Sequence, residues 1–263
     1  MTSSADRTIA ALRTGHDELA AKIVVLKPDA LGGRSGASEW TVAQVLSHLG
    51  SAAEINAAML DRELDGAPEP APDANQRVWD RWNAMSRAEQ ADSFLKANAV
   101  LVERYESLDE GTRATKQIDL GFLPTPVDVA TAAGFRLNEF TLHAWDVEVG
   151  LDPGARLAQD AVEQLLDVAP HMLGWLGKPD VLDGREVTIA VHLTDLGRKF
   201  GLQLDDSVAL TDAPGGADAT LRLPAESWLR LLFGRLAPAN TPAEVAVTGA
   251  ITLDELRQVF PGF

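Results

Sequence analysis

In the N-terminal half of the chain, apolar residues recur every three to four positions, which is the periodicity of amphipathic helices. Thr41 and Gln44 fit a capping box at the start of one such segment, and Ser86 and Glu89 repeat this arrangement at the start of another. Stretches rich in proline or glycine separate the periodic segments. The pattern predicts four long helices and a short one, over residues 6–26, 42–64, 74–85, 87–108 and 126–149.

The last of these helices has a clear beginning and end in the sequence. Thr125 fits the N-cap, Pro126 the first helical position and Asp128 the first turn, while Gly150 is expected to end the helix. Four long helices suit an antiparallel bundle whose ligand residues project inward from facing helices.

The C-terminal part of the chain has a different pattern. Residues 157–176 have helical spacing, and Pro170 is expected to kink or split that helix. Alternating apolar and polar positions then predict strands, with two helical segments among them. The predicted strands cover residues 186–193, 199–204, 207–210, 219–223 and 244–248, and the predicted helices cover residues 225–234 and 252–259.

The two patterns meet at the loop Asp152-Pro153-Gly154. A chain of 263 residues has room for two domains of ordinary size. We therefore expect an α+β protein in which residues 1–152 form a four-helix bundle and residues 153–263 form a smaller mixed α/β domain.

The charge of the chain excludes two classes of partner. It has 23 Lys and Arg against 39 Asp and Glu, a net charge of -16 that repels nucleic acids and anionic membranes. No apolar run approaches the ~20 residues that span a bilayer, and the N-terminus lacks the pattern of a signal peptide. We expect a cytoplasmic protein, monomeric or homodimeric, that binds small molecules rather than nucleic acid or membrane.

Cysteine is absent from the chain. The protein therefore has no disulfide, no thiolate metal ligand and no cysteine nucleophile. Any thiol chemistry must use a thiol supplied from outside.

The segment from Arg136 to Asp146 carries the most distinctive chemistry. Glu139 and His143 are four residues apart, so on a helix their side chains project from one face about 5–6 Å apart at Cβ and could chelate a metal ion. Arg136 and Asp146 extend the same stripe among apolar neighbours. The other interpretation is a buried ladder of salt bridges between packed helices, because buried charges need partners.

A third metal ligand is available in the helix that follows Thr41. His48 lies on the apolar sector of that helix with Val45 and Leu49, where it is either a hydrogen-bonded core residue or a ligand. His16, in the first helix, is interpreted as a solvated surface residue without a role.

Three motifs spread over nearly the whole chain resemble those of the mycothiol-dependent maleylpyruvate isomerase family. They are Trp40-Thr41-x-x-x-Val45-x-x-His48-Leu49, Arg136-x-x-Glu139-x-x-x-His143-x-Trp145-Asp146, and the closing set Gly234-Arg235, Val247-Thr248-Gly249 and Phe260-Pro261-Gly262.

This resemblance implies a DinB-like four-helix domain that carries a divalent metal, usually zinc, and a C-terminal domain similar to sterol carrier proteins. It implies mycothiol as the thiol cosubstrate. The ligands that it implies are His48, Glu139 and His143, the same three residues that their spacing nominates.

Two histidines and one carboxylate leave an open position on a four-coordinate zinc ion, as in catalytic sites. The positive charge of the metal would lower the pKa of a thiol or water placed there. A thiolate that adds to an activated double bond and leaves after rotation isomerises cis to trans, whereas stopping after addition gives an S-transferase. The expected function is therefore a thiol-dependent isomerase or transferase that acts on a small electrophile.

Three further residues are candidates for the catalytic site. Asp146 is expected to orient a ligating histidine through its other ring nitrogen, or else to form a salt bridge with Arg136 at the helix end. Arg81 and Arg235 are candidates for binding carboxylates of the thiol or of the substrate. A helix-end dipole interaction also explains Arg235.

Two other functions are compatible with the sequence. The open metal position could activate water, which would make the protein a metal-dependent hydrolase. Alternatively, the metal is structural and the second domain is a binding module that holds an apolar ligand between its sheet and the helix over residues 225–234.

Overall fold

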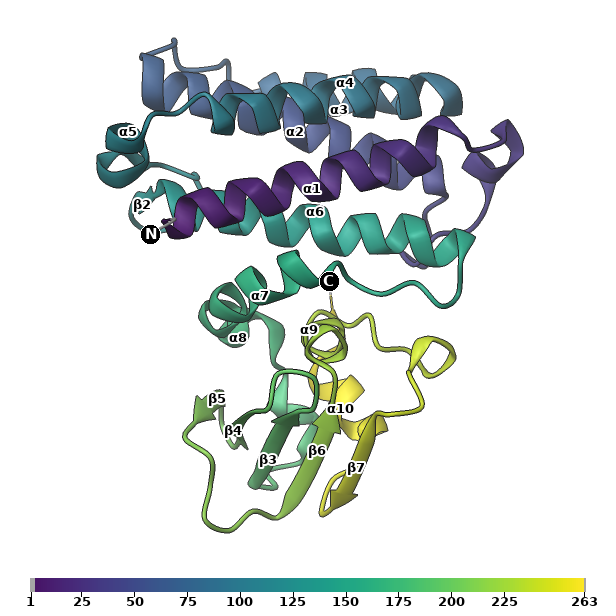
Figure 1. The fold of residues 1–263 in the computed structure, drawn as a ribbon, viewed down its shortest axis with the longest axis vertical. Coiled ribbons are helices and arrows are strands. Elements are labelled where there is room, and N and C mark those ends of the chain that lie inside the picture. The colour runs from purple at the N-terminus through teal and green to yellow at the C-terminus, as the bar shows by residue number, and fades with distance from the viewer. Residues whose placement is uncertain (1–2, 263) are drawn as a thin grey trace. The chain divides into compact units, whose positions relative to one another are not determined.

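The computed structural model describes residues 3–262 and divides into two compact units, residues 1–164 and residues 165–263 (Figure 1). The first unit is helical and the second is built around a five-stranded sheet. The predicted α+β class is confirmed. The boundary that we predict from the sequence, after residue 152, falls in the loop that follows the last long helix of the first unit.

Four long helices form the body of the first unit, and ion pairs between them establish their directions. Lys22 pairs with Glu148 near the C-terminal ends of α1 and α6, so these two helices run parallel. Arg104 pairs with Asp61 near the C-terminal ends of α4 and α2, which also run parallel. The chain returns between α2 and α4 through α3. The elements are α1 Ser4–Val24, a 3-10 turn η1 Pro28–Gly32, α2 Val42–Asp65, α3 Ala74–Asn83, α4 Arg87–Glu106, α5 Glu110–Thr115 and α6 Val129–Leu151.

Both capping boxes are confirmed. The side chain of Thr41 accepts a hydrogen bond from the backbone N–H of Gln44, and the side-chain oxygen of Gln44 accepts one from the backbone N–H of Thr41. Ser86 and Glu89 make the same reciprocal pair at the start of α4. These bonds satisfy backbone donors that a helix N-terminus leaves unpaired.

The predicted ends of α6 are wrong. The helix starts after Asp128, whose carboxylate accepts from the backbone N–H of Thr131 at 2.7 Å, because Val127 and Asp128 form strand β2. Strand β2 (Val127–Asp128) pairs antiparallel with β1 (Gln117–Ile118), which holds Thr125 and Pro126 outside the helix.

Gly150 lies inside α6 instead of ending it. A Cβ atom at this position would be 2.2 Å from the carbonyl oxygen of Arg34. The glycine therefore allows the loop before α2 to approach the last turn of α6 closely.

The second unit is a mixed sheet covered by helices. Its strand order is β5-β4-β3-β6-β7, with β3 and β6 parallel and the other neighbours antiparallel. The ring of Trp228, in the buried helix α9, contacts that of Phe200 in β4 at a centroid distance of 5.3 Å. The strands are β3 Val187–Leu193, β4 Arg198–Leu204, β5 Val208–Thr211, β6 Ala219–Leu223 and β7 Ala246–Gly249, and the helices are α9 Ala225–Leu232 and α10 Leu253–Val259.

Pro170 splits the preceding helical segment, as the sequence predicts. Helix α7 (Gln159–Val168) gives way to the 3-10 turn η2 (Ala169–Met172) and the short helix α8 (Leu173–Leu176). The remaining turns are η3 (Pro179–Leu182) and η4 (Pro238–Asn240). Across residues 3–262, no helix is both long enough and apolar enough to cross a membrane.

The indole of Trp82 in α3 packs against Gly50 of α2 and connects the two helices. Trp82 is 2% exposed, and its Nε1–H donates to Glu54 of α2 at 3.1 Å. A Cβ atom on Gly50 would lie 2.2 Å from the indole ring. The close contact between α2 and α3 therefore depends on a glycine, which has no side chain, at position 50.

The variant Gly50→Ala is expected to destabilise the protein by about 1–3 kcal/mol, because the added methyl group overpacks a site that is already filled by Trp82. Gly174→Ala in α8 is the matched control, since a Cβ atom there meets nothing within 4 Å. Urea unfolding followed by circular dichroism measures both variants. An equal free energy of unfolding for the two variants would show that the packing of Trp82 tolerates a methyl group at position 50.

Candidate metal centre

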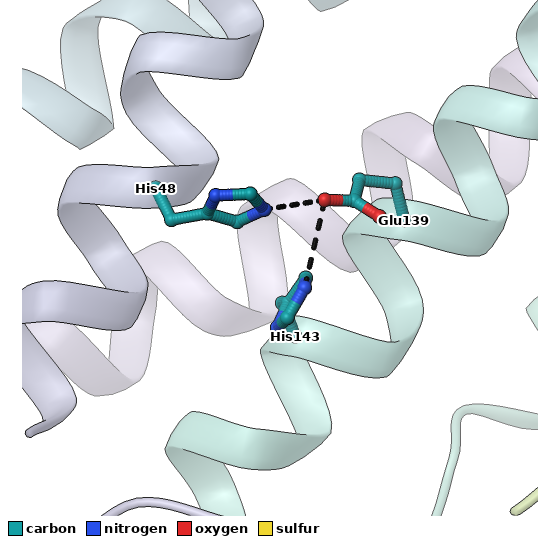
Figure 2. A group of neighbouring side chains, drawn as sticks. All are labelled: His48, Glu139 and His143. Atoms are coloured by element: carbon teal, nitrogen blue, oxygen red, sulfur yellow. Dashed lines mark hydrogen bonds and ion pairs between the residues drawn. The ribbon is translucent and has the colours of Figure 1, made fainter. Parts of the chain in front are cut away.

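Helices α2 and α6 bring His48, Glu139 and His143 together (Figure 2). The Nε2 atom of His48 lies 2.5 Å from Oε1 of Glu139, and Nε2 of His143 lies 3.5 Å from the same oxygen. One donor atom from each residue lies within 4.8 Å of the other two. Three residues nominated from the sequence therefore share one small volume.

The donor set fits a divalent metal such as zinc. Two imidazole nitrogens and one carboxylate oxygen are ordinary zinc ligands, and at bond lengths of about 2.0–2.2 Å two ligands of a tetrahedral ion are roughly 3.3–3.5 Å apart. The 3.5 Å between His143 and Glu139 has this value. The shorter His48 to Glu139 distance is that of a direct hydrogen bond between the two side chains.

Asp146 contacts the ring nitrogen of His143 that faces away from the other two candidate ligands. Its Oδ2 lies 2.8 Å from Nδ1 of His143, and its side chain is 1% exposed. A carboxylate at Nδ1 favours the tautomer that leaves Nε2 free to bind a metal. Arg136 is ten residues earlier in α6, a rise of about 15 Å along the helix, which is too far for the alternative salt bridge.

Trp40 covers the two histidines. Its ring lies 5.1 Å from that of His48 and 6.1 Å from that of His143, centroid to centroid. The loop that carries Trp40 is held on α6 by a hydrogen bond from the backbone N–H of Gly36 to the carbonyl of Asp146, at 2.7 Å. The indole therefore shields one side of the candidate metal site.

Glu139 is ionised at neutral pH. Burial alone would raise the pKa of Glu139, but the hydrogen bond with His48 and the neighbouring positive charges lower it to about 2. The carboxylate is therefore available as a ligand without having to lose a proton.

A buried polar network lies beside the candidate ligands and joins all four long helices. Arg136, 2% exposed, donates through Nη2 to the carbonyl of Leu49 at 3.2 Å and to Oδ1 of Asn98 at 2.7 Å. The amide nitrogen of Asn98 in turn lies 2.9 Å from Nδ1 of His16. Leu49 is the residue after His48, so this network fixes α2 against α6 next to a candidate ligand.

This network is not among the features that the sequence predicts. His16 was expected to be solvated, and this is wrong, because it is 6% exposed and bonded to Asn98. The available signal was Asn98 itself, a polar residue that shares the apolar face of α4 with Phe94 and Leu101. A polar residue in such a position usually has a buried partner.

The two other candidate arginines each donate a hydrogen bond within their own unit. Arg81, in α3, donates to Glu54 of α2 and lines a hollow between α2, α3 and α4. Arg235 belongs to the second unit, where its Nη1 donates to the carbonyl of Phe233 at 3.0 Å.

Comparison with known proteins gives one match to a family and two informative structural matches. Residues 12–148 match the sequence profile described as the mycothiol maleylpyruvate isomerase N-terminal domain. Two crystal structures of the mycothiol-dependent maleylpyruvate isomerase, one of them of a histidine-to-alanine mutant, share the fold with a TM-score of 0.65. They are 14% identical to this chain, and the alignment covers 96% of it and 98% of theirs. No curated protein sequence matches the chain.

We expect Asp146→Asn to weaken metal binding by about 10- to 100-fold, because the amide does not hold His143 in the ligating tautomer as a carboxylate does. The measurement is competition for zinc with a chromophoric chelator. Asp160→Asn, at an exposed carboxylate, is the control and should bind as the wild type does. Unchanged affinity in Asp146→Asn would contradict the orienting role.

We expect Asn98→Leu to destabilise the protein by about 2–3 kcal/mol, because Arg136 loses a hydrogen-bond acceptor while remaining charged and buried. Asn75→Leu, at an exposed position of α3, should change stability by less than about 0.5 kcal/mol. Urea unfolding measures both values. A loss no larger than that of the control would mean that the network contributes nothing to stability.

Proposed function

Because the chain belongs to the mycothiol maleylpyruvate isomerase family by the match over residues 12–148, we propose that it is a metal-dependent enzyme that uses mycothiol or a similar low-molecular-weight thiol. Its reaction would be an isomerisation or an S-transfer on a small electrophilic substrate. The observation that carries this proposal is the convergence of His48, Glu139 and His143 from two helices.

The residues around these three support a catalytic rather than a structural metal. Three protein ligands leave one position open on a four-coordinate ion, whereas structural zinc sites usually have four. A zinc ion in this position would lower the pKa of a thiol or water placed at the open position. Glu139 contributes one negative charge, Asp146 orients His143, and Trp40 limits access of water from one side.

The thiol must come from outside the chain, because the sequence contains no cysteine. In the proposed isomerisation, the thiolate sulfur forms a bond to the β-carbon of a double bond conjugated to a carbonyl group. The former double bond then rotates as a single bond, and the same carbon–sulfur bond breaks to release the trans alkene and the thiolate. If the α-carbon is protonated instead, the thioether is the product and the reaction is an S-transfer.

The two parts of the chain have different domain types in this proposal. We propose residues 1–152 as a DinB-like metal-binding domain and residues 153–263 as a domain similar to sterol carrier proteins. Arg235 is our candidate for binding a carboxylate of the thiol or of the substrate, because its guanidinium would offset the negative charge of the protein.

Two alternative functions, a metal-dependent hydrolase and a small-ligand-binding protein, can be compared with the structure. A hydrolase would use the same metal ligands, and turnover that is indifferent to added thiol would identify it. For a binding protein, the relevant feature is a hollow of about 150 Å³ in the second unit, lined in part by Phe200 and Trp228. This volume is below the roughly 300–1,000 Å³ of ordinary ligand pockets, so it gives the binding-protein alternative little support.

We expect His48→Ala to lose both bound metal and thiol-dependent turnover, because two ligands from α6 alone bind a divalent ion weakly. Elemental analysis of the purified protein measures the metal, and an assay with mycothiol and maleylpyruvate measures turnover. His171→Ala is the matched control, since His171 is exposed in the second unit. A His48→Ala protein that is fully active without metal would refute the proposal.

A further inference from the structure

A hollow of about 350 Å³ lies between α2, α3 and α4. Two of its lining residues, Glu54 and Ala57, come from α2. At 3.6 residues per turn they point about 120° and 180° away from the direction of His48. The hollow therefore opens on the side of α2 that faces away from the candidate metal centre, and its volume is within the range of small-molecule sites.

The walls of this hollow are mostly apolar. Trp82 and Met85 come from the α3 side, and Ala97 and Val100 come from α4. Val100 is 56% exposed, although it lies within a helix that packs against two others. An apolar wall that remains open to solvent is available to the apolar part of a ligand.

Positive charge borders the same hollow. Lys96 is exposed and has no ion-pair partner among residues 3–262. Arg81 donates through Nη2 to Glu54, and its Nε and Nη1 have no partner in the described part of the chain. The carboxylate of Glu54 is already shared between Arg81 and the indole N–H of Trp82. The two cations therefore outweigh the single carboxylate, in a protein with a net charge of -16.

We propose that this hollow is a second small-molecule site, separate from the metal centre, which binds an amphipathic monoanion such as an aryl or short-chain alkyl carboxylate. The apolar body of the ligand lies against Met85, Ala97 and Val100. Its carboxylate lies between Lys96 and the unused edge of the Arg81 guanidinium, which matches a planar carboxylate. A ligand with more negative charge is less suitable, because Glu54 is close to the anion position.

The probe is 8-anilino-1-naphthalenesulfonate, an aromatic monoanion whose fluorescence rises in apolar surroundings. We expect saturable binding of one probe per chain, with displacement by 4-phenylbutyrate and much weaker displacement by the neutral 4-phenylbutanol. Binding should weaken as salt is raised, because the cations at the rim are exposed. His48→Ala should bind the probe as the wild type does, which separates this site from the metal centre.

Two variants test the assigned residues. Lys96→Met removes the unpaired cation, and Val100→Asp places a negative charge on the exposed wall, so each should weaken probe binding by about fivefold to tenfold. Their matched controls are Lys27→Met and Val24→Asp, at an exposed lysine and at a valine that is 72% exposed in α1. Circular dichroism checks that all four variants are folded.

Three results would overturn the proposal. The first is the absence of saturable binding by the wild-type protein. The second is equal displacement by the acid and the alcohol, which would show that the charge is not recognised. The third is wild-type affinity in both Lys96→Met and Val100→Asp, which would place the probe elsewhere on the chain.

Discussion

The hydrogen bonds of Arg136 hold α2, α4 and α6 in register at the level of the candidate metal centre. Its guanidinium bonds to the carbonyl of Leu49, the residue after His48, and to the side chain of Asn98. Chelation requires His48 to lie opposite Glu139 and His143 within a few tenths of an ångström. Apolar contacts alone tolerate small shifts between helices, whereas directional hydrogen bonds from a buried charge oppose them, so Arg136 restricts the shift of α2 against α6 beside the candidate ligands.

The buried guanidinium of Arg136 needs a negative charge nearby, and Glu139 of the candidate metal site supplies it. The Nε and Nη1 atoms of Arg136 make no hydrogen bond to residues 3–262, and burial lowers the pKa of Arg136. The carboxylate of Glu139, one helical turn further along α6, opposes that shift through its negative charge. Because arginine stays charged even when buried, Glu139 acts both as a candidate ligand and as a counter-charge for the core. The same carboxylate is therefore a counter-charge for the buried Arg136 and, in the proposed function, a metal ligand.

The sequence predicted the parts of the site that depend on local spacing. The i, i+4 pair on α6 and the helix that begins after the capping box at Thr41 are short-range patterns. They nominate Glu139, His143 and, on the apolar sector of that helix, His48 as candidate ligands. The start of α6 was misplaced because the pairing of β1 with β2 withdraws Thr125 and Pro126 from the helix, which is a tertiary effect. The position of Asn98 on an apolar helix face indicates a buried partner, but that partner, His16, lies on a different helix, so no local pattern could identify it.

Helix α2 lies between the candidate metal centre and the hollow that α2, α3 and α4 enclose. One face presents His48 to α6, where charged groups are satisfied by each other and by a metal ion in the proposed function. The opposite side presents Glu54 to α3 and receives Trp82 against Gly50, which leaves an open apolar hollow with cations at its edge. The residues that line the hollow are not the three candidate ligands, so a substitution in the hollow replaces none of them. A shift of α2 would nevertheless alter both environments together, because each includes residues of this helix.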